Sequence, residues 1–277
     1  MGIRGAAEHL GVSKAMTAVT DDRETYLADF AAFEKGRRDP PAVRRLRQGA
    51  IERFAALGFP TTEDEEWRFT NLAPLARVPF RLAASRPAAL TEADVQRLTF
   101  PDAGCHRLVF VNGRFAAELS TRRPLPDGVL LGSLAEALRS HGDKVEPHLA
   151  RYADYEEQAL TALNTAFFSD GAFLLLPRNT VVAEPVHLVF VSTAATDPTV
   201  SHPRNLVVAG VSSQVRLVES YVGLGDGVYF TTPSPRSRPA RTRGSTTASS
   251  SAKAAGRSTS PPCTCTTTAV APSPRSR

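Results

Sequence analysis

The chain has 277 residues, of which 33 are Lys or Arg and 28 are Asp or Glu, and its formal net charge is +5. The excess positive charge belongs to the C-terminal end: eight basic and no acidic residues follow Thr232, and 25 basic and 28 acidic residues precede it. Residues 1–232 therefore have the composition of a mildly acidic globular protein, and any affinity for nucleic acid would belong to the tail alone.

The cysteine count and the apolar runs exclude two further classes of protein. Cys105, Cys263 and Cys265 form an odd, sparse set that provides no disulfide framework and favours a reducing cytoplasm. No apolar run approaches the roughly 20 residues that a membrane-spanning helix needs, and the N-terminus lacks the continuous apolar segment of a signal peptide. We therefore expect a cytoplasmic chain with no membrane partner.

Residues 1–24 are expected to be flexible, and residues 25–165 to form a mainly helical region with one short β-hairpin. Apolar residues recur at helical spacing in two runs, and the Pro40-Pro41 pair between them marks the start of the second helix. Gly58 is placed to end that helix. The apolar positions are Tyr26, Leu27, Phe30 and Phe33 in the first run, and Val43, Leu46, Ile51, Phe54 and Leu57 in the second.

Further helices and the hairpin follow in the same region. A short helix is predicted near Glu92–Leu98, and the stretch "HRLVFVNGRF" is typical of a hairpin with an Asn112-Gly113 turn. Two more helices are predicted over Leu130–Arg139 and Lys144–Leu163. We expect these helices to pack a core rather than to carry chemistry.

From Gly171 the pattern changes to short Val- and Leu-rich strands separated by Pro, Asn and Gly. The triplets Pro177-Arg178-Asn179 and Pro203-Arg204-Asn205 recur about 26 residues apart, and a Val-Val pair closely follows each. This repeat indicates a β-solenoid, although a β-sandwich fits the same strands. The predicted fold class is α+β, in which a helical region precedes the first coils of a β-helix over residues 166–231.

Residues 232–277 contain almost nothing that could contribute to a core. After Phe230 there is no Leu, Ile, Met, Phe, Tyr or Trp, and the one Val is Val270. One interpretation is a disordered tail, because such a composition cannot offset the entropy lost on folding. The other interpretation is an out-of-frame translation, in which one base was lost from the gene near Thr232.

The genetic code favours the second interpretation. If one base is missing, each original codon is the third base of one present codon plus the first two bases of the next. A four-fold Ser codon then conceals Phe, Leu, Ile or Val; Thr conceals His, Asp, Asn or Tyr; Cys conceals Leu, Met or Val; and Pro conceals a small residue. In "STSPPCTCTT", residues 258–267, the concealed residues largely alternate between apolar and polar, as in a half-buried strand. Restoring a single A converts "FTTPSPR" into Phe-Thr-Asn-Ala-Val-Thr-Glu.

Three stretches together resemble the SufB/SufD family of the Suf iron–sulfur cluster assembly system, and the SufD branch more than the SufB branch. They are "LGFPTTEDEEWRFTNLAPL" (57–75), "LNTAFFSDGAFLLLPRNTVVAEPVHLVFV" (163–191) and "HPRNLVVAGVSSQVRLVESYVG" (202–223). The resemblance covers roughly residues 25–232. It implies a helical N-terminal region, a right-handed parallel β-helix and a C-terminal helical segment.

The resemblance also implies a function without catalysis by this chain. Members of the SufD branch are scaffold subunits that pair with SufB and bind the ATPase SufC, in a complex that builds or transfers a nascent iron–sulfur cluster. ATP is hydrolysed by SufC, and no cofactor is expected on this chain alone. The SufC-docking segment and the cluster-related histidine of the family are expected to be absent here, so no catalytic, cofactor-binding or metal-binding residue is assigned.

The cysteines and their neighbours are candidate chemical groups. Cys263 and Cys265 are spaced like a metal-binding pair, but a structural zinc site needs about four donors. Cys105 and His106 begin a predicted strand, where alternation points neighbouring side chains to opposite faces. We therefore expect no nucleophile–base pair there, but a buried Cys beside a surface His.

Two alternative functions stay open at this point. One is a carbohydrate-active β-solenoid enzyme that uses Glu184 and Glu219, which requires the two carboxylates to lie about 5–10 Å apart. The other is a nucleic-acid binder that uses the Arg-rich tail, although the tail has no aromatic residue for base stacking. The acidic run Glu63–Glu66 is expected to face solvent rather than to bind a divalent ion.

Overall fold

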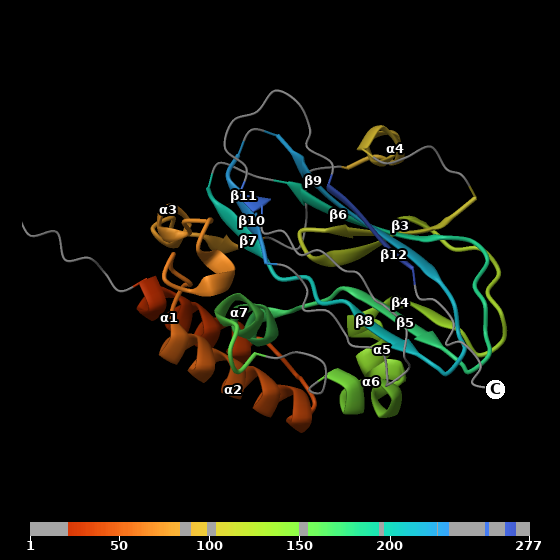
Figure 1. Cartoon of the computed structure of the whole chain (residues 1–277), viewed down its shortest axis with the longest axis horizontal. Coiled ribbons are helices and arrows are strands. Elements are labelled where there is room, and N and C mark those ends of the chain that lie inside the picture. The colour runs from red at the N-terminus through yellow and green to blue at the C-terminus, as the bar shows by residue number, and fades with distance from the viewer. Residues whose placement is uncertain are drawn as a thin grey trace, which may run out of the picture.

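A computed structural model describes residues 22–83, 90–98, 104–149, 155–193, 197–225 and 227–232, and the backbone of two later strands, 253–254 and 264–269. In Figure 1 most helices lie at the left and bottom of the molecule, the strands extend to the right, and one short helix lies apart at the top beside the strands. Within the described part of the chain, no helix is long and apolar enough to cross a bilayer. The segment predicted to be flexible lies outside the described residues, except for residues 22–24, which begin the first helix.

The first two helices, α1 (Asp22–Lys35) and α2 (Pro41–Leu57), form where the apolar periodicity predicted them. Pro41 occupies the first turn of α2, where its missing N–H removes no intrahelical hydrogen bond. Gly58 ends α2 with φ of 70°, and its N–H donates to the Phe54 carbonyl at 2.8 Å. The predicted stop at Gly58 is therefore confirmed.

Helix α7 (Ala159–Phe167) is the central helix of the helical side, because all nine of its residues are buried. It packs against both α1 and α2. The three helices meet through aromatic rings. Tyr26 of α1 lies 5.6 Å from Phe54 of α2, and Phe30 of α1 lies 5.7 Å from Phe167 of α7, both edge to face. The periodic positions Leu27 and Leu57 instead lie at the edge of this cluster, 38% and 37% exposed.

The predicted hairpin is confirmed as strands β2 (His106–Val111) and β3 (Arg114–Thr121). Asn112 and Gly113 form its two-residue turn with φ of 51° and 74°. Asn and Gly are the residues that adopt such positive φ angles most readily in this kind of turn, which explains why the sequence signal was reliable.

The other elements of this region are short. They are η1 (Glu65–Trp67), α3 (Ala73–Ala76), β1 (Arg81–Leu82), α4 (Glu92–Leu98), β4 (Leu130–Ser133), α5 (Leu134–Ser140) and α6 (Gly142–Leu149). The prediction of helix from Leu130 is wrong for its first four residues, which form β4 because they pair with a later strand. The helix predicted from Lys144 to Leu163 is two helices, since α6 ends at Leu149 and α7 begins at Ala159.

Six later strands form two consecutive triplets. The first is β5 (Ala172–Leu176), β6 (Val186–Thr193) and β7 (Thr199–Ser201), and the second is β8 (Leu206–Ala209), β9 (Arg216–Leu224) and β10 (Tyr229–Thr231). β8 pairs in parallel with β5, β9 with β6, and β10 with β7, so each pair lies in a different sheet. The paired residues are 33, 31 and 30 positions apart in the three sheets.

The two Pro-Arg-Asn triplets do not mark this structural repeat. Pro177 follows β5, whereas Pro203 lies shortly before β8, and the ladder places Leu176 beside Ala209. The two triplets therefore occupy different corners, and the 26-residue spacing in the sequence is shorter than the structural interval. Because the connections between strands differ in length, the same three residues recur at positions that do not lie beside each other in the sheet.

Strands from the first half of the chain extend the same three sheets. β1 pairs in parallel with β7, β2 in parallel with β6, and β4 antiparallel with β5. The region predicted to be mainly helical thus supplies β1 and β4 to two of the sheets, and both β2 and β3 to the five-stranded sheet. Across β2, β6 and β9, the rings of Phe110, Phe190 and Tyr221 stack as a ladder, with centroids 5.1 and 4.8 Å apart.

Two short strands lie in the segment where we expected no structure. β11 (Lys253–Ala254) pairs antiparallel with β10, and β12 (Thr264–Ala269) pairs antiparallel with β9. β9 and β10 are the last strands of the parallel pairing. Their outer edges are therefore open to pairing with any extended segment, and here β12 and β11 pair with them. The other residues beyond Thr232 lie outside the described part of the chain. Among the described strands, β8 has no neighbour on its outer side.

Candidate functional site

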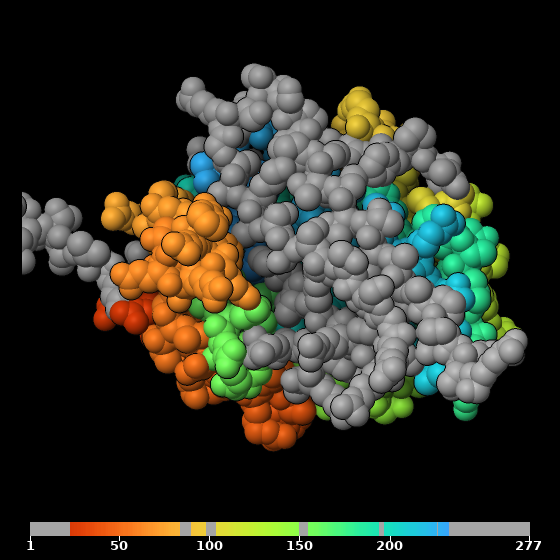
Figure 2. Space-filling model, viewed as in Figure 1, coloured from red at the N-terminus to blue at the C-terminus, as the bar shows by residue number. Residues whose placement is uncertain are grey.

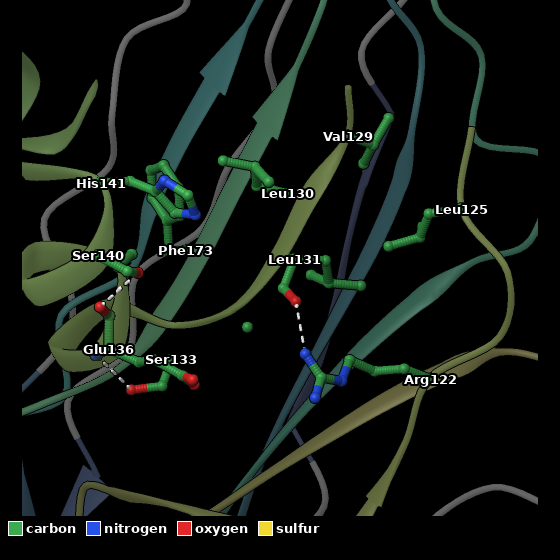
Figure 3. A pocket seen from close by; sticks show the side chains of 12 residues that line it. Arg122, Leu125, Val129, Leu130, Leu131, Ser133, Glu136, Ser140, His141 and Phe173 are labelled. Atoms are coloured by element: carbon green, nitrogen blue, oxygen red, sulfur yellow. Dashed lines mark hydrogen bonds between the residues drawn. The ribbon is translucent and has the colours of Figure 1, made fainter. Parts of the chain in front are cut away.

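A pocket of about 390 Å³ lies between the β3–β4 connection, β4, α5 and β5 (Figure 3). This volume falls within the range of small-molecule sites. The floor is apolar and includes Leu125, Val129, Leu131 and Phe173, the last three of which are buried. The rim is polar and carries Arg122, Glu136 and His141.

The hydroxyl groups of this pocket are already engaged. The Ser133 Oγ donates to Asp170 Oδ1 at 2.7 Å, and the Ser140 Oγ donates to the Glu136 carbonyl at 2.9 Å. The Arg122 guanidinium donates to the Leu131 carbonyl at 3.3 Å. The Ser133 hydroxyl is thus bound to a carboxylate, and the Ser140 hydroxyl to a backbone carbonyl. The pocket therefore combines an apolar lining with hydroxyl groups that already have hydrogen-bond partners.

A second polar site is buried where α7 meets the ends of the strand triplets. The Asn164 side-chain amide donates to the Pro203 carbonyl at 2.8 Å and to the Thr232 hydroxyl at 3.0 Å. His202 Nδ1 lies 2.9 Å from the same hydroxyl, and its ring stacks on Phe167 with centroids 5.2 Å apart. Burial lowers the pKa of His202 to about 3, so its imidazole is neutral near pH 7.

A third buried group, Asp170, joins the hairpin, α5 and β5. Its Oδ1 accepts from the Ser133 hydroxyl and from the N–H groups of Ala135 and Gly171, and its Oδ2 accepts from the Phe115 N–H. Four donors on one carboxylate tie the hairpin, α5 and the start of β5 together. Asp170 is therefore an organiser of the fold at the pocket wall.

None of these buried polar groups was selected from the sequence. Asn164 and Asp170 do stand within "LNTAFFSDG", where polar residues interrupt an otherwise apolar stretch. A polar residue on a fully buried helix needs a hydrogen-bond partner. A polar residue within such an apolar stretch therefore indicates a buried hydrogen-bonded site. Apart from Gly171, which is next to Asp170 in the sequence, the partners come from 35 to 68 residues away and could not be read from spacing.

The prediction for Cys105 and His106 is wrong in its assignment of burial. His106 is fully buried and Cys105 is only partly buried. The Nδ1 of His106 accepts a hydrogen bond from the Arg123 N–H at 3.2 Å, and burial lowers its pKa. His106 begins β2, whose six residues are all buried. Both faces of this strand are covered, so the alternation of side chains does not place His106 in solvent.

The acidic run faces solvent, as predicted. Glu63–Glu66 are exposed. They lie on the segment between α2 and β1, which belongs to the orange part of the surface in Figure 2. Among the described residues there is no group of three or more metal-ligating side chains. Trp67 is partly buried, and Phe69 is 95% exposed.

The carboxylate pair of the carbohydrate-enzyme alternative does not converge. Val186 lies beside Leu217, so Glu184 and Glu219 are four positions apart along neighbouring chains, about 13 Å at strand spacing. Glu219 is bound to the Asn205 amide and the Tyr221 hydroxyl, at 3.0 and 3.2 Å.

The remaining tail candidates cannot be placed. Cys263 lies outside the described residues, and only the backbone of Cys265 is described, in β12. The arginines of the nucleic-acid alternative also lie outside the described residues.

Much of the described part of the chain matches a known family model. The model for the SufBD protein N-terminal region matches residues 22–188, well over half of the chain. The chain therefore belongs to the SufB/SufD family.

Individual relatives agree with this family. The chain is 32% identical over 218 residues to an iron–sulfur cluster assembly SufBD family protein of Synechocystis sp., which covers 79% of this chain and 47% of the relative. It is 29% identical over 199 residues to the iron–sulfur cluster assembly protein SufD of Bacillus subtilis, covering 69% and 44%. A SufBD family protein of Arabidopsis thaliana is 26% identical over 207 residues, covering 68% and 43%. The chain thus spans somewhat less than half the length of these relatives.

Proposed function

We propose that this chain is a SufD-type scaffold subunit of an iron–sulfur cluster assembly complex and catalyses no reaction by itself. The family match over residues 22–188 is the observation that carries the proposal. The geometry supports it, because the two candidate glutamates lie apart along neighbouring strands. The sparse cysteines support a reducing, cytoplasmic setting.

We further propose that the two strand triplets are consecutive coils of a right-handed parallel β-helix. Parallel pairing of each strand with the third strand after it, in three separate sheets, supports this architecture. A coil buries its apolar face only against a neighbouring coil, so a scaffold of this kind needs a continued stack. The outer edge of β8 is where such a continuation would pair.

The proposed partners are a SufB protein and the ATPase SufC. The nascent iron–sulfur cluster is cargo of the complex, and ATP is bound and hydrolysed by SufC rather than by this chain. The residues that dock SufC and hold the cluster are proposed to be encoded beyond Thr232 in another reading frame. The absence of core-forming residues after Phe230 and the alternation concealed in residues 258–267 support this reading-frame proposal.

Co-purification tests the proposal. A tagged 277-residue chain and a tagged product of the gene with one base restored near codon 232 are each co-expressed with SufB and SufC from the same genome. We expect the frame-restored product to retain both partners and the 277-residue chain to lose SufC. Failure of the frame-restored product to retain either partner contradicts the scaffold proposal. Retention of SufC by the 277-residue chain contradicts only the proposed location of the docking segment.

A further inference from the structure

Residue 232 lies at a fully buried junction between three parts of the chain. It directly follows β10, its side chain has no exposed surface, and its N–H donates to the Ser201 carbonyl at 3.1 Å. Its hydroxyl lies 3.0 Å from the Asn164 amide nitrogen on α7 and 2.9 Å from His202 Nδ1. The side chain at this position therefore connects the central helix to the end of the strand stack.

A threonine hydroxyl does not satisfy the groups around it. Its oxygen accepts from the Asn164 amide and lies 2.9 Å from His202 Nδ1, where the imidazole tautomer decides which of the two atoms donates. The second hydrogen of the Asn164 amide goes to the Pro203 carbonyl, which can only accept, so the amide orientation is fixed. The Asn164 Oδ1 is consequently buried with no hydrogen-bond partner. A buried acceptor without a donor is rare in folded proteins and destabilising.

The reading-frame argument limits what else could stand at this position. If the lost base immediately precedes the codon of Thr232, the original codon ends in AC and encodes His, Asp, Asn or Tyr. Asp offers no hydrogen to the Asn164 Oδ1 and would bury a charge with no cation among the partners of the site. His and Tyr are much larger than Thr, and the position has no exposed surface into which they could extend.

Asn is the one of the four residues that meets both requirements. It has nearly the volume of Thr, and its amide carries two hydrogens and an acceptor oxygen. One hydrogen can donate to the Asn164 Oδ1, the oxygen can accept from the Asn164 amide, and the second hydrogen can serve His202 Nδ1 in the tautomer that accepts at that nitrogen. We infer that residue 232 of the natural protein is Asn, and that it completes a buried amide clamp between α7 and the end of the strand stack. This inference rests on the reading-frame part of the proposed function.

The protein experiment uses the 277-residue chain with Thr232→Asn and, as the matched control, the isosteric Thr232→Val. We expect Thr232→Asn to raise the melting temperature by about 2–4 °C, because it satisfies a buried acceptor, and Thr232→Val to lower it. The same two changes are then made in an Asn164→Ala background, where the gain from Thr232→Asn should vanish. A lower melting temperature for Thr232→Asn, or an equal gain in both backgrounds, overturns the inference.

Resequencing the gene across codons 229–236 gives an independent answer. A codon AAC at position 232 supports the inference, and we expect that result. A missing base found after an intact Thr codon overturns the clamp but leaves the reading-frame proposal standing. An uninterrupted frame through the tail overturns both, whereas the scaffold role is decided separately by co-purification.

Discussion

Among the described glycines for which the space around a Cβ atom is known, Gly171 leaves the least room for one. A Cβ atom at this position would lie 2.0 Å from the Arg204 carbonyl oxygen, which is backbone and cannot rotate away. The glycine precedes β5 and stands beside Arg204 before β8, so the close approach sets how tightly this pair of strands begins. A single missing methyl group thus permits the parallel pairing.

Gly171→Ala is expected to lower the free energy of unfolding by about 3 kcal/mol, because the backbone must separate to admit the Cβ. Gly36→Ala is the control, since its nearest atom would lie at an ordinary 3.9 Å and the site is exposed. Urea denaturation measures both. Similar values for the two variants would contradict the close approach.

His202 predicts a pH dependence of stability. Its folded pKa is about 3, well below the ordinary value of 6.5, so between these values the unfolded chain binds a proton that the folded chain does not. Stability is therefore complete above pH 6.5 and falls as the pH is lowered towards 3, by up to about 1.4 kcal/mol per pH unit from this residue. His202→Gln removes this titration.

The free energy of unfolding, measured between about pH 4 and 7, should fall more steeply for the natural chain than for His202→Gln. His106 and His187 also have lowered pKa values and remain in both proteins, so the difference isolates His202. Parallel curves would show that His202 is protonated in the folded state at moderately acid pH.

At the scale of elements, the aromatic ladder couples three strands that are distant in sequence. Phe110 on β2, Phe190 on β6 and Tyr221 on β9 are register partners, and the planes of neighbouring rings are inclined by only 17° and 14°. Each ring contacts the next one, and Phe190 contacts both. The ladder therefore stabilises the register of β2, β6 and β9 in the five-stranded sheet.

Double-mutant cycles test this arrangement. Phe110→Leu and Phe190→Leu should show a coupling energy of about 0.5–1.5 kcal/mol in the free energy of unfolding, the usual value for an aromatic pair. Phe110→Leu and Tyr221→Leu, which flank the ladder without touching, should be additive. Coupling of equal size in both cycles would mean that the sheet responds as a whole rather than ring by ring.

At the scale of the whole molecule, the outer edge of β8 is open among the described strands. Val211 follows this strand and is 54% exposed. Val181 lies between β5 and β6 of the first triplet and is 53% exposed. Open strand edges with apolar neighbours promote association between chains. We therefore expect the 277-residue chain to associate at high concentration through this end of the stack.

Val211→Lys should reduce concentration-dependent association measured by sedimentation velocity, because a charge beside the open edge opposes pairing. Val181→Lys is the matched control, with the same change at equal exposure one triplet earlier. If both variants reduce association equally, general solubility and not the open edge is the cause.

The sequence by itself determined the local elements whose signals are short-range. Periodic apolar residues with Pro41 and Gly58 defined α2, Asn112-Gly113 defined the hairpin turn, and the quoted stretches identified the family. It did not determine that residues 130–133 form a strand, that His106 is buried, or that the Pro-Arg-Asn triplets lie out of register. Each of these depends on a partner dozens of residues away.

The tertiary structure decided which polar groups meet. Asn164, Pro203 and Thr232 converge because α7 lies against the ends of two strand triplets, and Asp170 gathers donors from the hairpin and α5 for the same reason. Local propensity acts over a few residues, whereas a buried hydrogen bond requires both partners to be brought together by the packing of whole elements. The end of α2 and the hairpin turn could therefore be predicted, and the buried contacts of residue 232 could be recognised only in three dimensions.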